Sequence, residues 1–155
     1  MERLNFPPLS VPLKIKENKH LIWDPIRKKY IQITPEEWVR QHCVQFLMSE
    51  LHVPQSVINV EKQIQLNGRT KPYDIVVFSS SGAILLLIEC KAPAVALSQK
   101  TLDQIAQYNS VINSKYLMLT NGLQHIYCKI NDTKNGYAFL KHLPPYSNWS
   151  LWKLQ

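Results

Sequence analysis

The strongest chemical signal in this sequence comes from two acids and a lysine near the middle of the chain. Glu89 and Lys91 follow an aliphatic run at the point where a buried strand would end. Side chains alternate along a strand, so Glu89 and Lys91 share one of its faces. If Ser81-Gly82 forms a two-residue turn, the preceding strand pairs so that Asp74 stands opposite Glu89.

The expected pairing of Asp74 with Glu89 would hold two carboxylates within roughly 5 Å of each other. Such groups repel unless a shared proton or a cation lies between them. Mg²⁺ fits because it takes a few carboxylate oxygens and completes its octahedron with water and phosphate oxygens. Lys91 could then orient a water or neutralise charge on a reacting phosphate. The pattern therefore indicates metal-dependent phosphodiester hydrolysis.

The Glu-x-Lys pair has a simpler alternative, because taken alone it is more often a strand-end salt bridge in solvent. For Asp74 the alternative is an acid beside a turn after Pro72. The combination is more specific than its parts. An apolar strand ends in Glu-x-Lys, a partner strand begins with Asp, and one register joins them.

The elements around these residues are expected in the order helix, three strands, helix, two strands. Thr34 is a plausible N-cap, with Pro35 at the first helical position and Glu37 three residues after the cap. That helix ends before Pro54, and Ser98 or Thr101 caps a second one. Apolar alternation and aliphatic runs predict five strands, over residues 60–66, 73–78, 83–90, 116–120 and 124–130.

This order predicts an α/β domain with a mixed central sheet of about five strands flanked by helices. The domain spans residues 34–130. Residues 1–33 form an N-terminal extension that we expect to contain a hairpin packed on the core, and residues 131–155 form a C-terminal arm.

Composition indicates which partner and which cellular compartment to expect. The chain has 155 residues and a net charge of +7, which favours a polyanionic partner. It has no apolar run of membrane-spanning length and no secretory h-region, so we expect a cytoplasmic protein without membrane contact. Its three cysteines are expected to be reduced and buried, and its histidines lack the spacing of a zinc site.

Five segments together carry a resemblance to a known family. They are Glu37–Gln41, Asp74–Val77, Glu89–Pro93, Gln104–Tyr108 with the form QxxxY, and Leu119–Gly122. Asp74 and the Glu89-x-Lys91 pair resemble the motif of the PD-(D/E)xK nuclease superfamily. In this order the segments resemble the N-terminal nuclease domain of type I restriction enzyme R subunits, over roughly residues 34–130.

The resemblance implies a restriction-endonuclease-like core and a role for each matching residue. Asp74 and Glu89 would bind Mg²⁺, for which Mn²⁺ would substitute, together with the main-chain carbonyl of Cys90. Lys91 would position or activate water. Glu37 would reach the metal or its waters, although a capping box with Thr34 also explains this residue.

The second helix would contribute Gln104 and Tyr108, which lie four residues apart on one face. They would approach the substrate, unless that face is only a solvated surface. Arg69, Lys71 and Arg40 are the expected DNA contacts.

The resemblance also bears on partners. R subunits continue into a motor, but these 155 residues contain no GxxxxGK[ST] loop, so we do not expect ATP-driven translocation from them. A homodimer, or association with separate restriction or motor subunits, fits this interpretation. Two alternatives stay open. One is a non-catalytic nucleic-acid-binding module that keeps the nuclease fold, and the other is a structural protein with an incidental ion pair.

Overall fold

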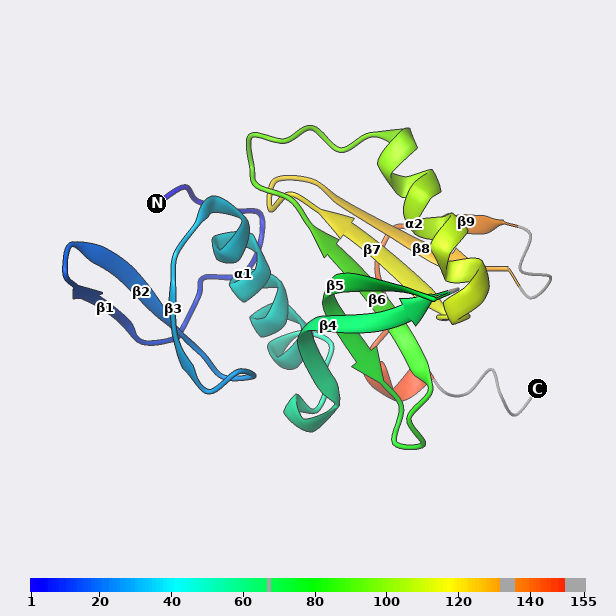
Figure 1. Cartoon of the computed structure of the whole chain (residues 1–155), viewed down its shortest axis with the longest axis horizontal. Coiled ribbons are helices and arrows are strands. Elements are labelled where there is room, and N and C mark those ends of the chain that lie inside the picture. Colours follow the sequence, from blue (N-terminus) through cyan, green and yellow to red (C-terminus); the bar gives the residue numbers. More distant parts are fainter. Residues whose placement is uncertain (67, 132–135, 150–155) are drawn as a thin grey trace.

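The computed structural model describes residues 1–66, 68–131 and 136–149, and this part of the chain forms two sheets and two α-helices (Figure 1). The first sheet has the order β1-β2-β3 and the second β4-β5-β6-β7-β8-β9. In the second sheet β6 and β7 run parallel while the other neighbours are antiparallel. The predicted α/β class with a mixed sheet is confirmed.

The elements follow one another along the chain in the order of their labels, with two short 3₁₀ helices among them. Their bounds are β1 Leu13–Lys16, β2 Lys19–Asp24, β3 Lys29–Gln32, α1 Pro35–Ser49, η1 Gln55–Val57, β4 Ile58–Leu66, β5 Arg69–Phe78, β6 Ile84–Cys90, α2 Gln99–Ile112, β7 Tyr116–Thr120, β8 His125–Ile130, β9 Tyr137–Leu140 and η2 Tyr146–Asn148.

Side-chain caps start both α-helices. The Thr34 hydroxyl accepts a hydrogen bond from the Glu37 N–H at 3.0 Å, and Pro35 follows the cap as predicted. At α2 the cap is Ser98 rather than Thr101, because the Ser98 hydroxyl accepts the Thr101 N–H at 3.2 Å. Each cap satisfies a backbone donor that has no partner within the helix.

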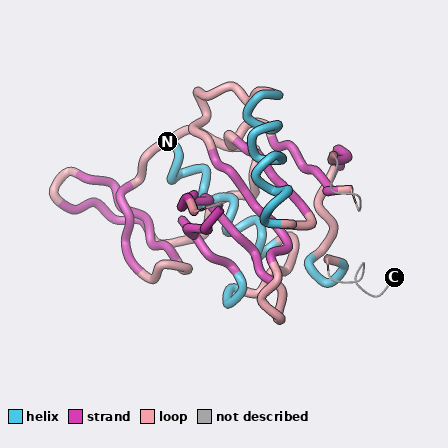
Figure 2. Tube along the Cα trace, turned by 45° about the vertical axis from the view of Figure 1, so that its right-hand side comes forward, coloured by secondary structure: helices cyan, strands magenta, loops and turns pink. Residues whose placement is uncertain are grey.

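Each helix covers one face of the six-stranded sheet, and strand alternation supplies both contact surfaces. Val39 and Leu47 of α1 are fully buried in one core cluster, together with Ile75 from β5. Leu102 of α2 is buried in the other cluster, together with the next β5 residue, Val76. Figure 2 shows α2 lying across the sheet, while α1 lies between the two sheets. Burial of each such side chain contributes about 1.5–3 kcal/mol.

The turn between β5 and β6 differs from the prediction. The Ser79 N–H bonds to the Ala83 carbonyl at 2.7 Å, so the turn is one residue longer than the expected Ser81-Gly82 turn. The longer turn would shift the pairing of β5 with β6 by one residue. A bulge between Val77 and Phe78 compensates for this shift, because it places one extra residue on one strand. Beyond the bulge Ile75 pairs with Ile88, which is the expected register.

The sheet has a sixth strand, β9, which the sequence did not predict because its four residues are at most half-buried at the sheet edge. It falls in the expected C-terminal arm, of which residues 132–135 and 150–155 lie outside the described part. Leu143 and Trp149 of the same segment are buried in the core. No helix among the described residues has the length and apolar character needed to span a bilayer.

Candidate active site

Asp74 is held from two directions at the point where β5 leaves its pairing with β6. Its Oδ2 accepts a hydrogen bond from the Cys90 N–H at 2.8 Å, and its Oδ1 accepts one from Nη2 of Arg40 at 2.7 Å. The first bond joins the two strands, and the second joins the sheet to α1. The carboxylate therefore has a fixed orientation beside the end of β6.

Glu89 is the neighbouring carboxylate, and it stands at the end of a run of four buried aliphatic residues, Leu85–Ile88. Its Oε1 is buried, and among the described residues it has no hydrogen-bond partner. Burial and the negative charge of Asp74 raise the pKa of Glu89 to about 7, although Lys71 and Lys91 act in the opposite direction. Near neutral pH this group can hold a proton or, if a cation is supplied, ionise.

Both carboxylates line an open cavity of about 460 Å³ at the end of β6. The lining is mostly polar and comes from α1, β4, β5 and β6. It consists of Glu36, Arg40, Glu61, Gln63, Pro72, Tyr73, Asp74, Glu89, Cys90 and Lys91. Lys91 thus reaches the same cavity as Asp74 and Glu89, and its positive charge acts on both Glu36 and Glu89.

The described residues contain no group of three His, Cys, Asp or Glu side chains close enough to hold a metal ion. Two carboxylates are nevertheless compatible with Mg²⁺, which keeps several waters and often takes only one or two protein carboxylates. The unpartnered Glu89 Oε1 is a ligand of the required type. Asp74, Glu89 and the main-chain carbonyl of Cys90 are the atoms here that could hold it.

Arg40 is buried, although the sequence suggested a DNA contact. Its guanidinium forms ion pairs with four carboxylates: Glu36 at 3.2 Å, Glu37 at 2.9 Å, Glu61 at 3.6 Å and Asp74 at 2.7 Å. Burial lowers the pKa of Arg40, but the bond to Asp74 and the charges of Glu37 and Asp74 outweigh it and the pKa is raised. Arg40 therefore organises the acids of the cavity, where its side chain is only 8% exposed.

Glu37 does not line the cavity, contrary to the role expected for it. Its Oε1 accepts from Arg27 at 2.6 Å and from Arg40 at 2.9 Å, and Gln41 lies 3.4 Å from its Oε2. Its backbone N–H makes the predicted bond to Thr34. Glu37 thus anchors Arg40 without lining the cavity itself.

Glu36 and Glu61 line the cavity, and neither is among the site residues predicted from the sequence. Glu36 precedes the predicted acid and pairs with Arg40 four positions later, a spacing that could have identified it. Glu61 has a positive φ of 55° where the pairing of β4 with β5 is interrupted for one residue pair, between Val60↔Ile75 and Lys62↔Tyr73, with no shift of register. No sequence signal marks that irregularity.

Four of the predicted residues remain, and the structure describes the side chains of two of them, Gln104 and Lys71. Gln104 is exposed on α2 and is absent from the cavity lining, so the structure does not bring it to Asp74. Lys71 is half-buried, and its pKa is lowered. Burial is the main cause and the charge of Lys91 adds to it, while the charge of Glu89 acts in the opposite direction. The side chains of Arg69 and Tyr108 lie outside the described part of the structure.

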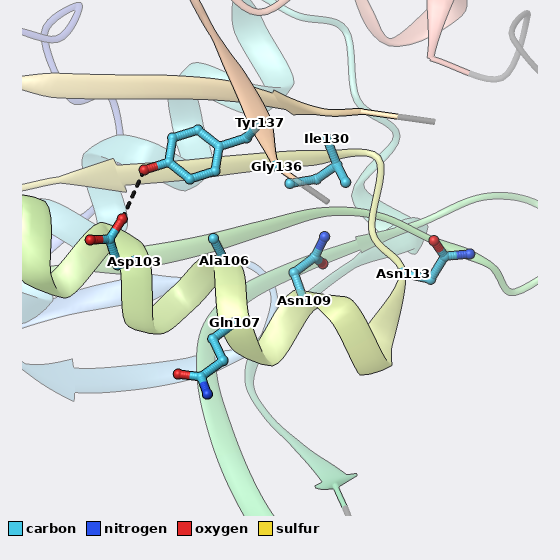
Figure 3. A pocket seen from close by; sticks show the side chains of 8 residues that line it. All are labelled: Asp103, Ala106, Gln107, Asn109, Asn113, Ile130, Gly136 and Tyr137. Carbon is cyan, nitrogen blue, oxygen red and sulfur yellow. Dashed lines mark hydrogen bonds between the residues drawn. The ribbon is translucent and has the colours of Figure 1, made fainter. Parts of the chain in front are cut away.

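A second, smaller cavity of about 240 Å³ lies beside α2 and β9 (Figure 3). Two of its lining residues are joined, because the Tyr137 hydroxyl donates to Asp103 Oδ1 at 3.0 Å. Gln99 Nε2 donates to the Tyr137 hydroxyl at 2.7 Å. Its wall includes Gly136, beside residues 132–135, which are outside the described part, and we assign no site to it.

Comparison with known proteins places the chain in a family. Residues 35–144 match the family described as the type I restriction enzyme R protein N terminus (HSDR_N). The chain belongs to this family. The match includes α1, the six strands of the large sheet and every residue that lines the larger cavity, so this R-protein N-terminal domain contains the whole candidate site.

One solved structure similar to this R-protein N-terminal domain is a fragment described as an HsdR subunit of a type I restriction enzyme from Vibrio vulnificus YJ016. The two share 17% sequence identity with a TM-score of 0.48. The similarity covers 68% of this chain and 22% of that one, so the chain spans about a fifth of the length of that fragment. No curated protein matches the chain.

Proposed function

We propose that this chain is a Mg²⁺-dependent nuclease domain of the PD-(D/E)xK type that hydrolyses phosphodiester bonds of DNA. The observation that carries the proposal is the buried, unpartnered Oε1 of Glu89 beside Asp74, in a cavity that also receives Lys91. A buried acceptor without a donor costs free energy. A cation bound between Glu89 and Asp74 would offset this cost, which supports a metal site at this position.

The residues of the candidate site have different roles in this proposal. Asp74 and Glu89 supply the negative charge that binds the cation, and Arg40 holds Asp74 in place through its 2.7 Å bond. Mg²⁺ would supply Lewis acidity toward the scissile phosphate and favour ionisation of a water. Lys91 donates to a phosphate oxygen or to the attacking water and offsets the charge that develops there.

The wider biological setting is proposed from the family alone. A type I R-protein N-terminal domain would act on DNA in the cytoplasm, with the motor function supplied elsewhere in the assembly. Mn²⁺ would replace Mg²⁺ because it accepts the same oxygen ligands. A homodimer stays a prediction that the contacts within one chain do not test.

One observation favours a second candidate, a nucleic-acid-binding module that has kept the fold without catalysis. Arg40 already neutralises part of the charge on Asp74, with Nη2 and Oδ1 2.7 Å apart. A cation is then less necessary for electrostatic balance. The two candidates differ in whether metal binding and cleavage accompany DNA binding.

The deciding experiment is cleavage of supercoiled plasmid and of labelled single- and double-stranded oligonucleotides with Mg²⁺, Mn²⁺ or EDTA. The wild type is compared with Lys91→Ala, and with Lys100→Ala as the control, since Lys100 is an exposed lysine on α2 that is absent from the cavity lining. Metal-dependent cutting that only Lys91→Ala loses supports the nuclease. DNA binding without cutting, and without a metal-induced shift in melting temperature, would favour the binding module.

A further inference from the structure

The β1–β3 sheet stands apart from the six-stranded sheet on the far side of α1 (Figures 1 and 2). One of its faces is directed toward α1. Ile22 and Asp24 on that face are completely buried, and Asp24 Oδ2 accepts a bond from Gln41 of α1 at 3.0 Å. Because side chains alternate along a strand, the residues between them point away from the body of the protein.

The pairing of the three strands identifies this outer face. Lys16 pairs with Lys19, Leu21 pairs with both Lys14 and Gln32, and Trp23 pairs with Tyr30. Directly paired residues share a face. The outer face, named here the basic-aromatic face, therefore consists of Lys14, Lys16, Lys19, Leu21, Trp23, Tyr30 and Gln32.

The basic-aromatic face combines exposed lysines with two aromatic rings. Lys14, Lys16 and Lys19 are all exposed. Trp23 and Tyr30 are half-buried and meet edge-to-face with their ring centroids 5.3 Å apart, while Lys14 Nζ lies 3.7 Å from the centre of the Tyr30 ring. Tyr30 is thus held by contacts with Trp23 and Lys14 within the sheet.

Two of the three lysines, Lys16 and Lys19, do not stabilise the fold through their charge. Lys16 and Lys19 stand directly opposite each other, and like charges in that position destabilise a sheet. Glu17 lies in the turn between β1 and β2, but no ion pair joins it to these lysines among the described residues. An arrangement that costs stability and concentrates positive charge suits a polyanion that neutralises it.

The rings distinguish between polyanions. The bases of a duplex are stacked on one another and are not free to lie on protein side chains, whereas unpaired bases stack on Trp and Tyr and their phosphates pair with lysines. An acidic protein segment would use the lysines but has no need of two adjacent aromatic rings. The combination therefore favours a single-stranded nucleic acid over both a duplex and an acidic protein.

We infer that the basic-aromatic face of the β1–β3 sheet binds single-stranded nucleic acid, with Trp23 and Tyr30 stacking on bases and Lys14, Lys16 and Lys19 contacting phosphates. This inference deepens the proposed function, because it gives the nuclease a surface that holds an unpaired strand. The sheet that carries this face is connected to the candidate site through Arg27, which also bonds Asp24 on the opposite face of the sheet. Arg27, in the turn between β2 and β3, bonds both Glu37 at 2.6 Å and the cavity residue Glu61 at 3.1 Å.

The test measures binding of labelled oligo(dT), a duplex and polyglutamate in EDTA, on a Glu89→Gln background in which cleavage is not expected. The triple variant Lys14→Gln, Lys16→Gln, Lys19→Gln is compared with a triple variant of equal charge, Lys100→Gln, Lys129→Gln, Lys141→Gln, whose lysines are exposed elsewhere. The first variant should bind oligo(dT) at least about tenfold more weakly, and the slope of its log binding constant against log salt concentration should be smaller by about two. The second variant should bind oligo(dT) with little change in affinity.

The aromatic contribution is tested separately. Tyr30→Ala should weaken oligo(dT) binding about tenfold, while Tyr30→Phe keeps the ring and should bind as the parent does. If both triple variants bind oligo(dT) alike, the inference is wrong. The inference is equally wrong if the first triple variant loses affinity for polyglutamate or duplex to the same extent as for oligo(dT), while Tyr30→Ala does not change the affinity for oligo(dT).

These outcomes are separable from those of the nuclease assay. A protein that binds oligo(dT) through this face but never cuts DNA would retain the inference and lose the proposed catalysis. A protein that cuts DNA, and whose triple variant binds and cuts a single strand as the wild type does, would retain the catalysis and lose the inference.

Discussion

Nη2 of Arg40 lies 2.7 Å from Oδ1 of Asp74, and this ion pair joins the first helix to the strand that carries the candidate metal ligand. The same guanidinium also pairs with Glu37, which Arg27 holds in turn. The chain of alternating charges continues to Asp24, which receives a side-chain bond from Arg27. The orientation of Asp74 therefore depends on residues from the β2–β3 turn, α1 and β5.

Replacing Arg40 should separate the structural role of this network from its role at the metal. Arg40→Gln leaves buried carboxylates without a counter-charge and should destabilise the fold by about 3–5 kcal/mol in metal-free buffer. Mg²⁺ or Mn²⁺ should then recover part of the loss, since a cation replaces the missing positive charge. The measurement is chemical denaturation with and without metal. A metal-induced gain no larger than that of the wild type would argue against a cation at Asp74.

The helix that carries Arg40 shows what the sequence could predict. Thr34 and Pro35 give a cap whose geometry is local, so α1 could be assigned from neighbouring residues alone. The aliphatic run before Glu89 similarly predicted β6 as a buried strand. The register of Asp74 beside Glu89 was also expected, although a longer turn and a bulge arrive at it together.

The contacts of Arg40 show what the sequence could not predict. Asp74 lies 34 positions from Arg40, and their contact depends on how α1 packs against the sheet. Glu61 reaches the cavity through a backbone irregularity that depends on pairing across β4 and β5. Composition and spacing report local structure well, but they do not specify which of several nearby acids turns inward. Hence Glu37 was expected at the cavity, and Glu36 is found there.

The two adjacent acids of α1 should respond differently to substitution. Glu37→Gln removes a buried charge between two arginines and should cost about 3 kcal/mol of stability. Glu36→Gln changes a side chain that is 47% exposed and should alter stability by no more than about 0.5 kcal/mol. Because Glu36 faces the cavity, its substitution should instead change the metal concentration required for cleavage. Denaturation and metal titration of both variants test this, and equal destabilisation would contradict it.

The raised pKa of Glu89 predicts a specific dependence of stability on pH. The pKa is about 7 in the folded protein and 4.5 in the unfolded reference, so the folded state binds the proton more tightly. Below pH 4.5 both states are protonated and Glu89 imposes no penalty. The penalty develops as the pH rises through the window from 4.5 to 7 and reaches at most about 3 kcal/mol.

Glu89→Gln cannot ionise and isolates this effect. In metal-free buffer the variant should gain stability over the wild type as the pH rises from 4.5 to above 7, and the two should be closest at the acid end. Adding Mg²⁺ should narrow the difference at high pH, because a bound cation favours the ionised wild-type carboxylate. Thermal melting across this range provides the measurement. A difference that does not change with pH would contradict the buried, ionisable character of Glu89.

Substitution of Cys90 tests whether this residue contributes its thiol or its main-chain carbonyl to the candidate site. Its thiol is fully buried, hydrogen bonding with Cys43 and burial raise its pKa, and only its N–H contacts Asp74 among the bonds described. Cys90→Ala should therefore keep metal-dependent cleavage within about twofold and lose only about 1–2 kcal/mol of packing stability. Asp74→Ala, in contrast, should abolish cleavage. If Cys90→Ala folds with normal stability loss but no longer cuts, the thiol itself would belong to the reaction, and the assignment of metal contact to the main-chain carbonyl would have to be abandoned.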